Sequence, residues 1–527
     1  MNSYRLILLL FFSANFWVAS QAQQLVKSEL LVQTHWSVNE LKQIFPKTEI
    51  QKISDVLSVY LLIQSSEFSV EDVALLSRNT NIGYVNYNRT VENRAIPNDS
   101  LWSQQWALYN DGVNGTVEDA DVDADEAWEL NTGGVNFKGD TLVVAVIDGG
   151  FDLNHEDINW FVNKADTFGN GLDDDSNGYI DDTFGWNAYS NNGDLSNSSD
   201  HGTHVSGIIG AKGNNTLGVT GINWDIQVLP IRGSSGTEST VLRAYSYVYD
   251  QRKLYNDTNG EKGALIVATN SSFGINYGQA NDYPLWCAMY DSLGSLGILN
   301  AVAGPNISIN IDDQGDMPGT CSSNYTICVT NTKSDDIKGN AGYGEVNVDL
   351  GAPGTNIIST VSDSSYAEMT GTSMASPLVA GTVGLGFSYL CEDQWMEYES
   401  KPDSVALFMK QIILESVDQN ITLLDKTVSD GRLNAHQFLV GIGNWCDGIY
   451  SVKEMEEAGV RLYPNPTVSQ LNVELKKPSN IILISLTGQI LAKYDFKEGV
   501  HQIDVSNLPA GMYFVRINHS TYPLIFQ

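Results

Sequence analysis

The stretch that most constrains the fold is a nearly continuous apolar run at residues 141–147, which ends on Asp148 and two glycines. A strand with apolar residues on both faces belongs inside a parallel sheet that helices cover on both sides. In such sheets, side chains that follow the carboxyl ends of the strands form the sites of chemistry. The run therefore predicts an α/β fold, with Asp148 at the edge where a site lies.

Two further motifs supply partners for this carboxylate. Ser373 stands in Gly-Thr-Ser-Met-Ala-Ser-Pro at the expected start of an apolar helix, and His201 stands in Asp-His-Gly-Thr-His at the start of a small-residue helix. A serine hydroxyl becomes a nucleophile when a base takes its proton and a third group orients that base. An ordinary helix entry, an interior histidine and a capping carboxylate would explain the motifs separately, but all three explanations would have to hold together.

With these motifs the chain resembles the subtilisin-like serine peptidases over about residues 97–440. The order Asp, His, Ser along the chain is the order of that family and differs from the order in other serine hydrolases. The resemblance implies that Ser373 is the nucleophile, that His201 is the general base and then the general acid, and that Asp148 orients the imidazole. It also makes His204 a structural neighbour of the base.

The resemblance further implies an amide donor for the oxyanion. In the family, an asparagine after Ala-Gly supplies this donor, and here Asn306 follows Ala-Gly-Pro, with Pro305 where glycine is usual. Asn306 is therefore our candidate, together with the backbone N–H of Ser373. Asn300 fits less well because it precedes the end of its strand.

A third apolar strand leads into Ser272, Phe273 and Gly274. These residues resemble the segment with which the family pairs an extended peptide substrate through main-chain hydrogen bonds. We therefore expect them to bind substrate.

Composition narrows the range of partners. The chain has 527 residues, enough for several domains and a large core, and its formal net charge is −34. This charge argues against a nucleic-acid partner and leaves no basic stripe for an anionic membrane. Beyond the N-terminal segment no apolar stretch is long enough to cross a bilayer, so we predict no integral membrane span.

Residues 1–22 have the features of a secretory signal peptide. Arg5 supplies a positive charge, residues 6–18 are apolar, and small residues precede a cleavage site after Ala22. A membrane anchor is the alternative, but the apolar run is short for a bilayer. We therefore expect a secreted or cell-surface protein that is exported through the periplasm.

The five cysteines fit an oxidising compartment. Cys321 and Cys328 are close enough in sequence to pair, and Cys391 with Cys446 is a second possible pair. An odd number leaves one cysteine free, and the sequence does not identify it.

Residues 23–96 alternate strand and helix patterns. A capping box that starts at Ser37 opens the first helix. The strand formers fill residues 29–34, 56–64 and 82–87. This βαββαβ pattern resembles a subtilisin prosegment, which implies a folding template and intramolecular inhibitor that is removed near residues 93–96. The alternative is an independent binding module.

An acidic loop between Asp148 and His201 predicts a calcium site. Residues 173–182 place carboxylates and an amide around a glycine turn, but lack the flanking helices and final glutamate of an EF-hand. The loop resembles a calcium loop of subtilases, and Asp157 resembles part of the family's other calcium site. The candidate ligands are Asp157, Asp173, Asp175, Asn177, Tyr179 and Asp182. The alternative is an acidic, solvated turn. We expect Ca²⁺ to be structural and catalysis to need no cofactor.

The composition changes after the peptidase region, which we place at residues 97–445. Residues 446–459 form a linker, and residues 460–527 contain the short, turn-punctuated strands of a small all-β sandwich. The Tyr-Pro-Asn-Pro motif that begins at Tyr463 and the block at residues 508–515 resemble the C-terminal sorting domain of the type IX secretion system. This resemblance implies the secretion machinery as a partner. The alternative is a lectin-like module that binds cell-surface sugar.

We therefore predict a secreted serine endopeptidase, made as a preproenzyme, that hydrolyses peptide bonds of protein substrates through an Asp-His-Ser triad and an acyl-enzyme. The expected fold is a parallel sheet sandwiched by helices, preceded by the small α+β prosegment and followed by the β-sandwich. The alternative is a catalytically weak or inactive scaffold that acts as a surface binding protein. The unusual Pro305 and the acidic composition suggest this alternative.

Overall fold

The structure is a computed structural model, and it describes most of the chain. The described residues are 25–69, 73, 76, 81–89, 96–446, 460–463, 470–485, 490–506, 508, 511–517 and 520–526. The predicted signal peptide, residues 93–95 of the predicted maturation site and nearly all of the predicted linker lie outside them. The chain divides into two compact units, Met1–Arg94 and Ala95–Gln527, which are described separately.

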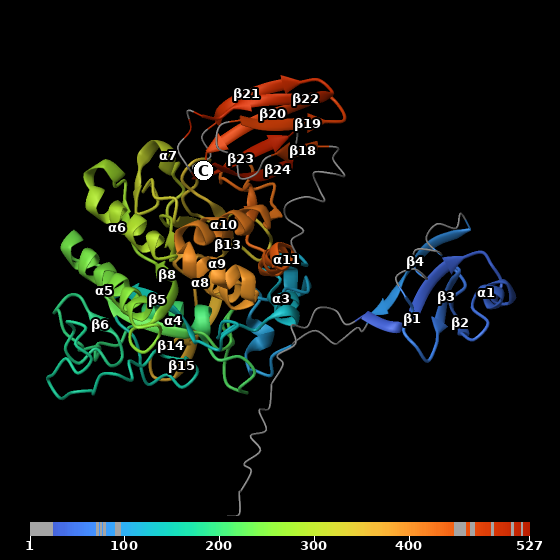
Figure 1. The fold of residues 1–527 in the computed structure, drawn as a ribbon. Coiled ribbons are helices and arrows are strands. Elements are labelled where there is room, and N and C mark those ends of the chain that lie inside the picture. The colour runs from blue at the N-terminus through green and yellow to red at the C-terminus, as the bar shows by residue number, and fades with distance from the viewer. Residues whose placement is uncertain are drawn as a thin grey trace, which may run out of the picture. The chain divides into compact units, whose positions relative to one another are not determined.

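The N-terminal unit is a small antiparallel sheet with one described helix (Figure 1). Its elements are β1 (Leu25–Thr34), α1 (Val38–Ile44), β2 (Glu49–Ser54), β3 (Val59–Ile63) and β4 (Ile82–Arg89), with the strand order β2-β3-β1-β4. Ser37 and Glu40 form the capping box expected before α1. Leu30, Leu41 and Leu62 are buried between helix and sheet. The predicted second helix lies almost wholly outside the described residues.

The second unit is built on a nine-stranded sheet, counted over the described residues, with the order β16-β17-β13-β12-β10-β8-β5-β7-β6. All neighbouring strands are parallel except β16 and β17. The strands are β5 (Leu142–Asp148), β6 (Trp186–Asn187), β7 (Gln227–Arg232), β8 (Leu265–Ser271), β10 (Leu299–Ala303), β12 (Thr326–Thr332), β13 (Leu350–Pro353), β16 (Asp418–Gln419) and β17 (Gly431–Arg432).

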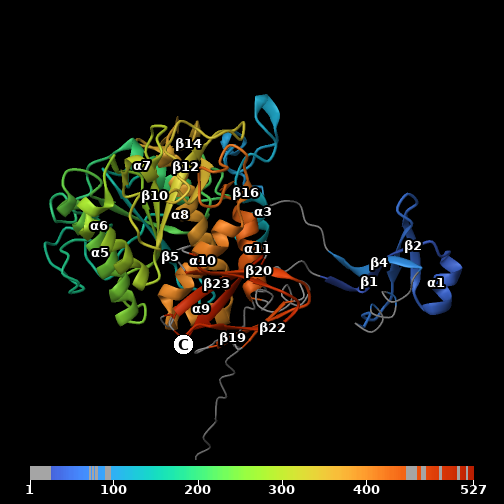
Figure 2. The same cartoon turned by 90° about the horizontal axis from the view of Figure 1, so that it is seen from above.

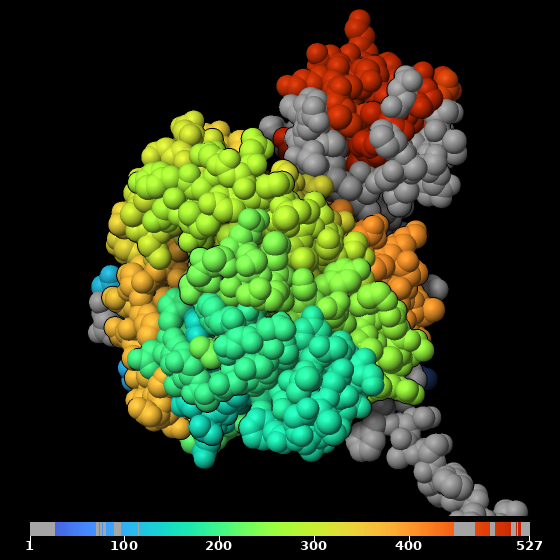
Figure 3. Space-filling view, turned by 90° about the vertical axis from the view of Figure 1, so that its left-hand side faces the viewer, coloured from blue at the N-terminus to red at the C-terminus, as the bar shows by residue number. Residues whose placement is uncertain are grey.

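Helices cover both faces of this sheet, and every residue of the central strand β5 is therefore buried. Val144 and Val146 point into the core shared with α4 (Asp200–Gly210) and α8 (Thr372–Tyr389). Val143 and Ala145 point into a second core, which also contains buried residues of α5 (Glu238–Asp257) and α6 (Pro284–Ser295). Figure 2 shows the two helix layers on opposite sides of β5, and Figure 3 shows the surface on the side of α5 and α6. The predicted α/β fold is confirmed.

The remaining elements of this unit complete its surface. The other helices are α3 (Ala124–Leu130), α7 (Ile311–Gln314), α9 (Glu392–Ser400), α10 (Pro402–Glu415) and α11 (Ala435–Cys446), and short 3-10 turns occupy Trp102–Gln104, Val113–Gly115 and Ala280–Asp282. Two small antiparallel pairs lie near the carboxyl edge of the sheet: β14 (Ile357–Val361) with β15 (Ser365–Met369), and β9 (Ile275–Asn276) with β11 (Asp316–Met317).

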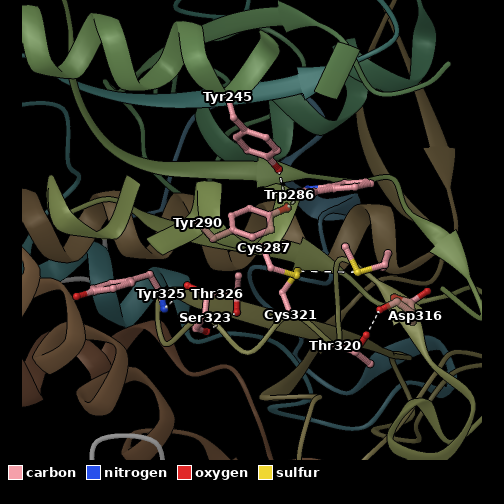
Figure 4. Close-up of a disulfide and its surroundings, with 11 residues drawn as sticks. Tyr245, Trp286, Cys287, Tyr290, Asp316, Thr320, Cys321, Ser323, Tyr325 and Thr326 are labelled. Carbon is pink, nitrogen blue, oxygen red and sulfur yellow. Dashed lines mark hydrogen bonds between the residues drawn. A yellow bond between two sulfur atoms is a disulfide. The ribbon is translucent and has the colours of Figure 1, made fainter. Parts of the chain in front are cut away.

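Two disulfides link the cysteines, and one predicted pair is wrong. Cys391 pairs with Cys446, as expected, but Cys321 pairs with Cys287 of α6 rather than with Cys328. Cys328 is free and buried within β12, where its side chain faces the core, whereas Cys321 lies in the loop after β11 that packs against α6 (Figure 4). Closeness in sequence therefore misidentified the partner.

The C-terminal region forms two antiparallel sheets, which confirms the expected all-β architecture. One sheet has the order β18 (Val460–Tyr463), β19 (Gln470–Leu475), β22 (Gly499–Asp504), and the other has the order β21 (Ile490–Phe496), β20 (Ser479–Ser485), β23 (Gly511–Ile517), β24 (Ser520–Phe526). Alternate residues from both sheets, among them Leu471, Val473, Ile481 and Val515, share one buried core.

Over the described residues, no single helix is long and apolar enough to cross a membrane. Helices α8 and α9 pass such a test only as a pair, with a bend of 112° between them.

Candidate active site

Asp148 and His201 meet at the carboxyl edge of the sheet. Asp148 is the last residue of β5 and is buried, and His201 lies in the first turn of α4. The Nδ1 atom of His201 lies 2.8 Å from Oδ2 of Asp148, and the other carboxylate oxygen accepts the backbone N–H of Gly149 at 2.6 Å. Gly202 allows the close approach of α4, since a Cβ there would lie 3.0 Å from Cβ of Asp148. The carboxylate thus fixes the orientation of the imidazole and leaves Nε2 available.

The electrostatics of the pair suit a general base. Burial alone would lower the pKa of His201, but the hydrogen bond to Asp148 and its negative charge together raise this pKa above the usual value. The imidazole side chain is 40% exposed, whereas that of Asp148 is 6% exposed. His201 can therefore exchange a proton with a bound molecule, while the buried Asp148 orients the imidazole and stabilises its charged form.

Ser373 is held at the start of α8 by the strand that lies next to β5. The hydroxyl of Ser272 donates to the carbonyl oxygen of Ser373 at 2.9 Å, and Oγ of Ser373 donates to the carbonyl oxygen of Ser272 at 3.4 Å. Ser272 directly follows β8, in which Ser271 is the register partner of Ile147. Because Ile147 precedes Asp148, both Asp148 and Ser373 lie around the end of β8.

Asn306 contacts the same turn. Its Oδ1 accepts the backbone N–H of Thr372 at 2.9 Å and the Thr372 hydroxyl at 3.2 Å, so its amide nitrogen remains a donor beside Ser373. Asn300, in contrast, is fully buried in β10, where its side chain bonds Thr269 and the carbonyl oxygen of Tyr325. The structure therefore places Asn306 at the candidate site and gives Asn300 a structural place within the sheet.

His204 lies one helical turn beyond His201 and is fully buried. Its Nε2 lies 2.9 Å from the carbonyl oxygen of Ile357 and 3.0 Å from that of Ala367, which belong to β14 and β15. Burial lowers its pKa to about 4. These contacts tie the hairpin to α4 and give His204 a structural place.

A cavity of about 240 Å³ opens beside Ser373. The predicted substrate residues Ser272, Phe273 and Gly274 line one part of it, and Asn306 lines another. Gly274 is exposed, whereas Ser272 is buried and already bonded to the turn that carries Ser373. The cavity can hold one side chain of a peptide whose carbonyl group lies against Ser373.

The acidic loop brings several of its predicted ligands together. The side-chain amide of Asn163 donates to Asp175 at 2.9 Å and to Asp182 at 2.8 Å, and the amide of Asn177 also bridges these two carboxylates. Asp173 accepts the backbone N–H groups of Asn177 and Gly178. The hydroxyl of Tyr179 points elsewhere and bonds Asp250.

Burial raises the pKa of Asp175 and raises that of Asp182 to about 6. Among the described residues, no ion pair with a lysine or arginine compensates either carboxylate. This oxygen-rich, acidic set fits a hard cation chemically. No group of three or more His, Cys, Asp or Glu side chains in the described part of the chain already has the spacing of a metal centre. An ion would therefore displace some of the present amide hydrogen bonds.

Asp157 lies at a separate place, fully buried. Its oxygens accept the side-chain amide of Asn215 at 2.7 Å, the hydroxyl of Tyr366 at 3.1 Å and the backbone N–H of Val219 at 3.2 Å. Asp99 accepts the backbone N–H of Asn214 in the same turn, at 2.8 Å. Asp99 was not among the predicted ligands, since nothing near it in sequence points to this turn.

Two residues that support Ser373 were also not predicted from the sequence. The hydroxyl of Ser376 lies 3.2 Å from that of Ser272, and the hydroxyl of Thr372 donates to the carbonyl oxygen of Gly304. Both belong to the motif around Ser373. The several hydroxyl residues at the start of this helix were the feature of the sequence that could have indicated their role.

A parallel α/β sheet with an Asp–His pair and a serine at its carboxyl edge defines the class of α/β serine hydrolases. Residues 139–443 match the Subtilase family, and the chain belongs to this family of serine proteases. Residues 461–525 match the secretion system C-terminal sorting domain, which indicates a secreted or cell-surface protein.

Similar proteins carry related names. "Subtilisin-like protease 1" of Plasmodium berghei is 30% identical over 74% of this chain and 60% of its own length. "Extracellular protease" of Xanthomonas campestris is 30% identical over 59% of this chain and 52% of its own length. The chain therefore spans about half to three fifths of these relatives. A solved protease from Pseudoalteromonas arctica is 20% identical, with a TM-score of 0.49, over 66% of this chain and 100% of that chain.

Proposed function

We propose that the protein is a secreted serine endopeptidase that cleaves peptide bonds through Asp148, His201 and Ser373. The observation that carries the proposal is the 2.8 Å contact of His201 with Asp148 at the same sheet edge where Ser272 holds Ser373. Oγ of Ser373 attacks the substrate carbonyl carbon, and Nε2 of His201 takes the hydroxyl proton. The proton then passes to the leaving amine as the C–N bond breaks, which leaves an acyl-enzyme.

Water completes the cycle by the same groups. Nε2 of His201 takes a proton from water, the hydroxide oxygen bonds to the acyl carbon, and the ester bond to Ser373 breaks as the proton returns to Oγ. In both halves the negative charge on the carbonyl oxygen is stabilised by the amide of Asn306 and the backbone N–H of Ser373. The free amide nitrogen of Asn306 beside Ser373 supports this assignment.

The direct test uses purified mature protein and a casein substrate. Ser373→Ala should abolish turnover, whereas His204→Ala should reduce it far less than His201→Ala. Casein that stays intact with correctly folded, mature protein would favour the alternative, an inactive scaffold that binds at the cell surface.

We also propose that residues 23–96 are an inhibitory prosegment. Support comes from a separately folded unit whose sheet and first helix match the βαββαβ expectation. The isolated unit, added to mature enzyme, should inhibit turnover, and Ser373→Ala should leave it attached.

Calcium is proposed as a structural ligand of the acidic loop around Asp175 and Asp182, with Asp157 as part of a second site. The support is chemical: buried carboxylates without a cationic partner among the described residues. No catalytic step uses the ion.

The C-terminal sandwich is proposed to be read by the type IX secretion machinery. Deleting residues 460–527 should retain the protein in the cell. If the domain is instead a lectin-like module, the same deletion would leave export unchanged and abolish sugar binding.

A further inference from the structure

One buried carboxylate in the cavity beside Ser373 has no place in the chemistry described above. Asp316 lines this cavity together with Ser373, and it is 2% exposed. The carboxylate accepts the backbone N–H of Gly319, but its Oδ2 atom has no hydrogen-bond partner, and no lysine or arginine of the described residues forms an ion pair with it. A buried carboxylate without a countercharge costs free energy unless a ligand supplies one.

Asp316 and Ser373 differ in accessibility: Ser373 is half-buried, whereas Asp316 is nearly inaccessible. The pairing of β11 with β9 holds Asp316 at the cavity, because it places Asp316 opposite Asn276, which also lines the cavity. A Cβ at Gly274 would lie 2.2 Å from the carbonyl oxygen of Met317, so only glycine permits this approach.

The backbone around Asp316 is firmly held. Its carbonyl oxygen accepts both the backbone N–H of Thr320 at 2.8 Å and the Thr320 hydroxyl at 2.7 Å. The next residue, Cys321, is joined to Cys287 of α6 by a disulfide (Figure 4). A carboxylate on such a rigid element is positioned before any ligand arrives.

Apolar residues contribute one part of the other walls of the cavity, and the polar Asn276 and Thr372 contribute another. The apolar ones include Phe273, Ala303, Pro305 and Ile307. A cavity lined by apolar side chains and by a buried carboxylate without a countercharge matches a side chain with a long methylene stem and a cationic head. Phenylalanine or leucine would fill the cavity but leave the carboxylate without a countercharge.

We propose that Asp316 makes this cavity a pocket for the lysine or arginine side chain that precedes the scissile bond. The inference rests on the proposed peptidase activity and adds its substrate class. A carboxylate at the base of a side-chain pocket selects basic residues in serine proteases of another fold. Burial raises the pKa of Asp316 to about 8, although the hydrogen bond from the backbone N–H of Gly319 lowers it, and a cationic side chain would oppose that rise.

The test compares fluorogenic peptides that differ only in the residue before the scissile bond: arginine, lysine, glutamine or phenylalanine. The enzymes are the wild type, Asp316→Asn, and the control Asp313→Asn, which alters an exposed carboxylate three residues away. Labelling with a fluorophosphonate counts active enzyme in each sample. The wild type and the control should prefer the basic peptides by at least about 10-fold in kcat/KM.

Asp316→Asn should lose about 100-fold in kcat/KM on the arginine peptide and less than about 3-fold on the phenylalanine peptide. A labelled wild-type enzyme that cleaves the phenylalanine peptide best would overturn the pocket assignment while leaving the proposed function intact. The same holds for an Asp316→Asn enzyme that keeps the basic preference. A protein that neither labels nor cleaves any peptide would overturn both. Should the variant fail to fold, the wild-type preference alone decides.

Discussion

Ser272 and Ser373 hold each other through two hydrogen bonds: the hydroxyl of Ser272 donates to the carbonyl oxygen of Ser373 at 2.9 Å, and the hydroxyl of Ser373 donates to the carbonyl oxygen of Ser272 at 3.4 Å. The end of β8 is thereby locked to the first turn of α8. Ser272 thus acts as a positioning residue, and the predicted substrate segment and the nucleophile form one rigid unit.

Ser272→Ala should lower kcat by about 10- to 100-fold with little change in KM, because a misplaced nucleophile weakens the reaction more than binding. Steady-state kinetics on one peptide substrate checks this. Ser271→Ala is the control, since the Ser271 hydroxyl bonds Tyr245 within the core and should affect stability rather than kcat. Equal kcat losses in the two variants would remove the special role of Ser272.

Asn306→Ala should lower kcat by about 10²- to 10³-fold and change KM little, because its amide acts on charge that develops in the transition state. Asn300→Ala should lower the thermal midpoint instead, since Asn300 bonds only within the sheet. Kinetics and thermal unfolding of both variants separate the two roles. The reverse pattern would show that the oxyanion donor has been misplaced.

The activity should fall at acidic pH through a pKa above the usual histidine value of 6.5. The base must be neutral, and Asp148 raises the pKa of His201, so kcat/KM is lost as the pH drops through that raised value. The contribution of the pair to folding stability has the opposite sign: it is present in full below the ordinary pKa and is lost as the pH rises through the raised one.

Asp148→Asn should shift the acidic limb of the pH profile to lower pH and reduce kcat by about 10⁴-fold. Profiles of kcat/KM for the wild type and this variant provide the measurement. An acidic limb that stays in place in the variant would mean that a group other than His201 titrates.

A chelator should lower the thermal midpoint, because an ion bound only by the folded state adds about 2.7 kcal/mol to the unfolding free energy at a hundredfold excess over Kd. Replacing Asp173 and Asp175 with asparagine should remove most of this sensitivity, whereas Asp257→Asn, on the exposed face of α5, should leave it unchanged. Calorimetry with and without chelator decides. An unchanged midpoint would make the loop an ordinary acidic turn.

Residues that sit in contiguous motifs could be predicted from the sequence, because short motifs carry both the side chain and the turn that presents it. Asp148, His201 and the assignment of the fold came from such motifs. Asn306 lies beside the turn that carries Ser373, as the strand before it led us to expect despite Pro305, and its role as the oxyanion donor stays a prediction.

Relationships across the sheet were not visible in the sequence. The partner of Cys321 is 34 residues away in α6, while the nearer Cys328 faces the core, so spacing along the chain gave the wrong disulfide. The role of Asp316 likewise depends on the pairing of β11 with β9, which brings a short isolated segment beside Ser373. Two-residue strands of this kind leave no periodicity to read.

The most direct test of the central claim is mass spectrometry of mature protein treated with a fluorophosphonate, read beside its remaining peptidase activity. We expect one adduct per molecule, on the peptide that contains Ser373, with activity lost in proportion to labelling and no adduct on Ser373→Ala or after denaturation. Turnover that persists in fully labelled protein, or an active Ser373→Ala variant, would contradict it.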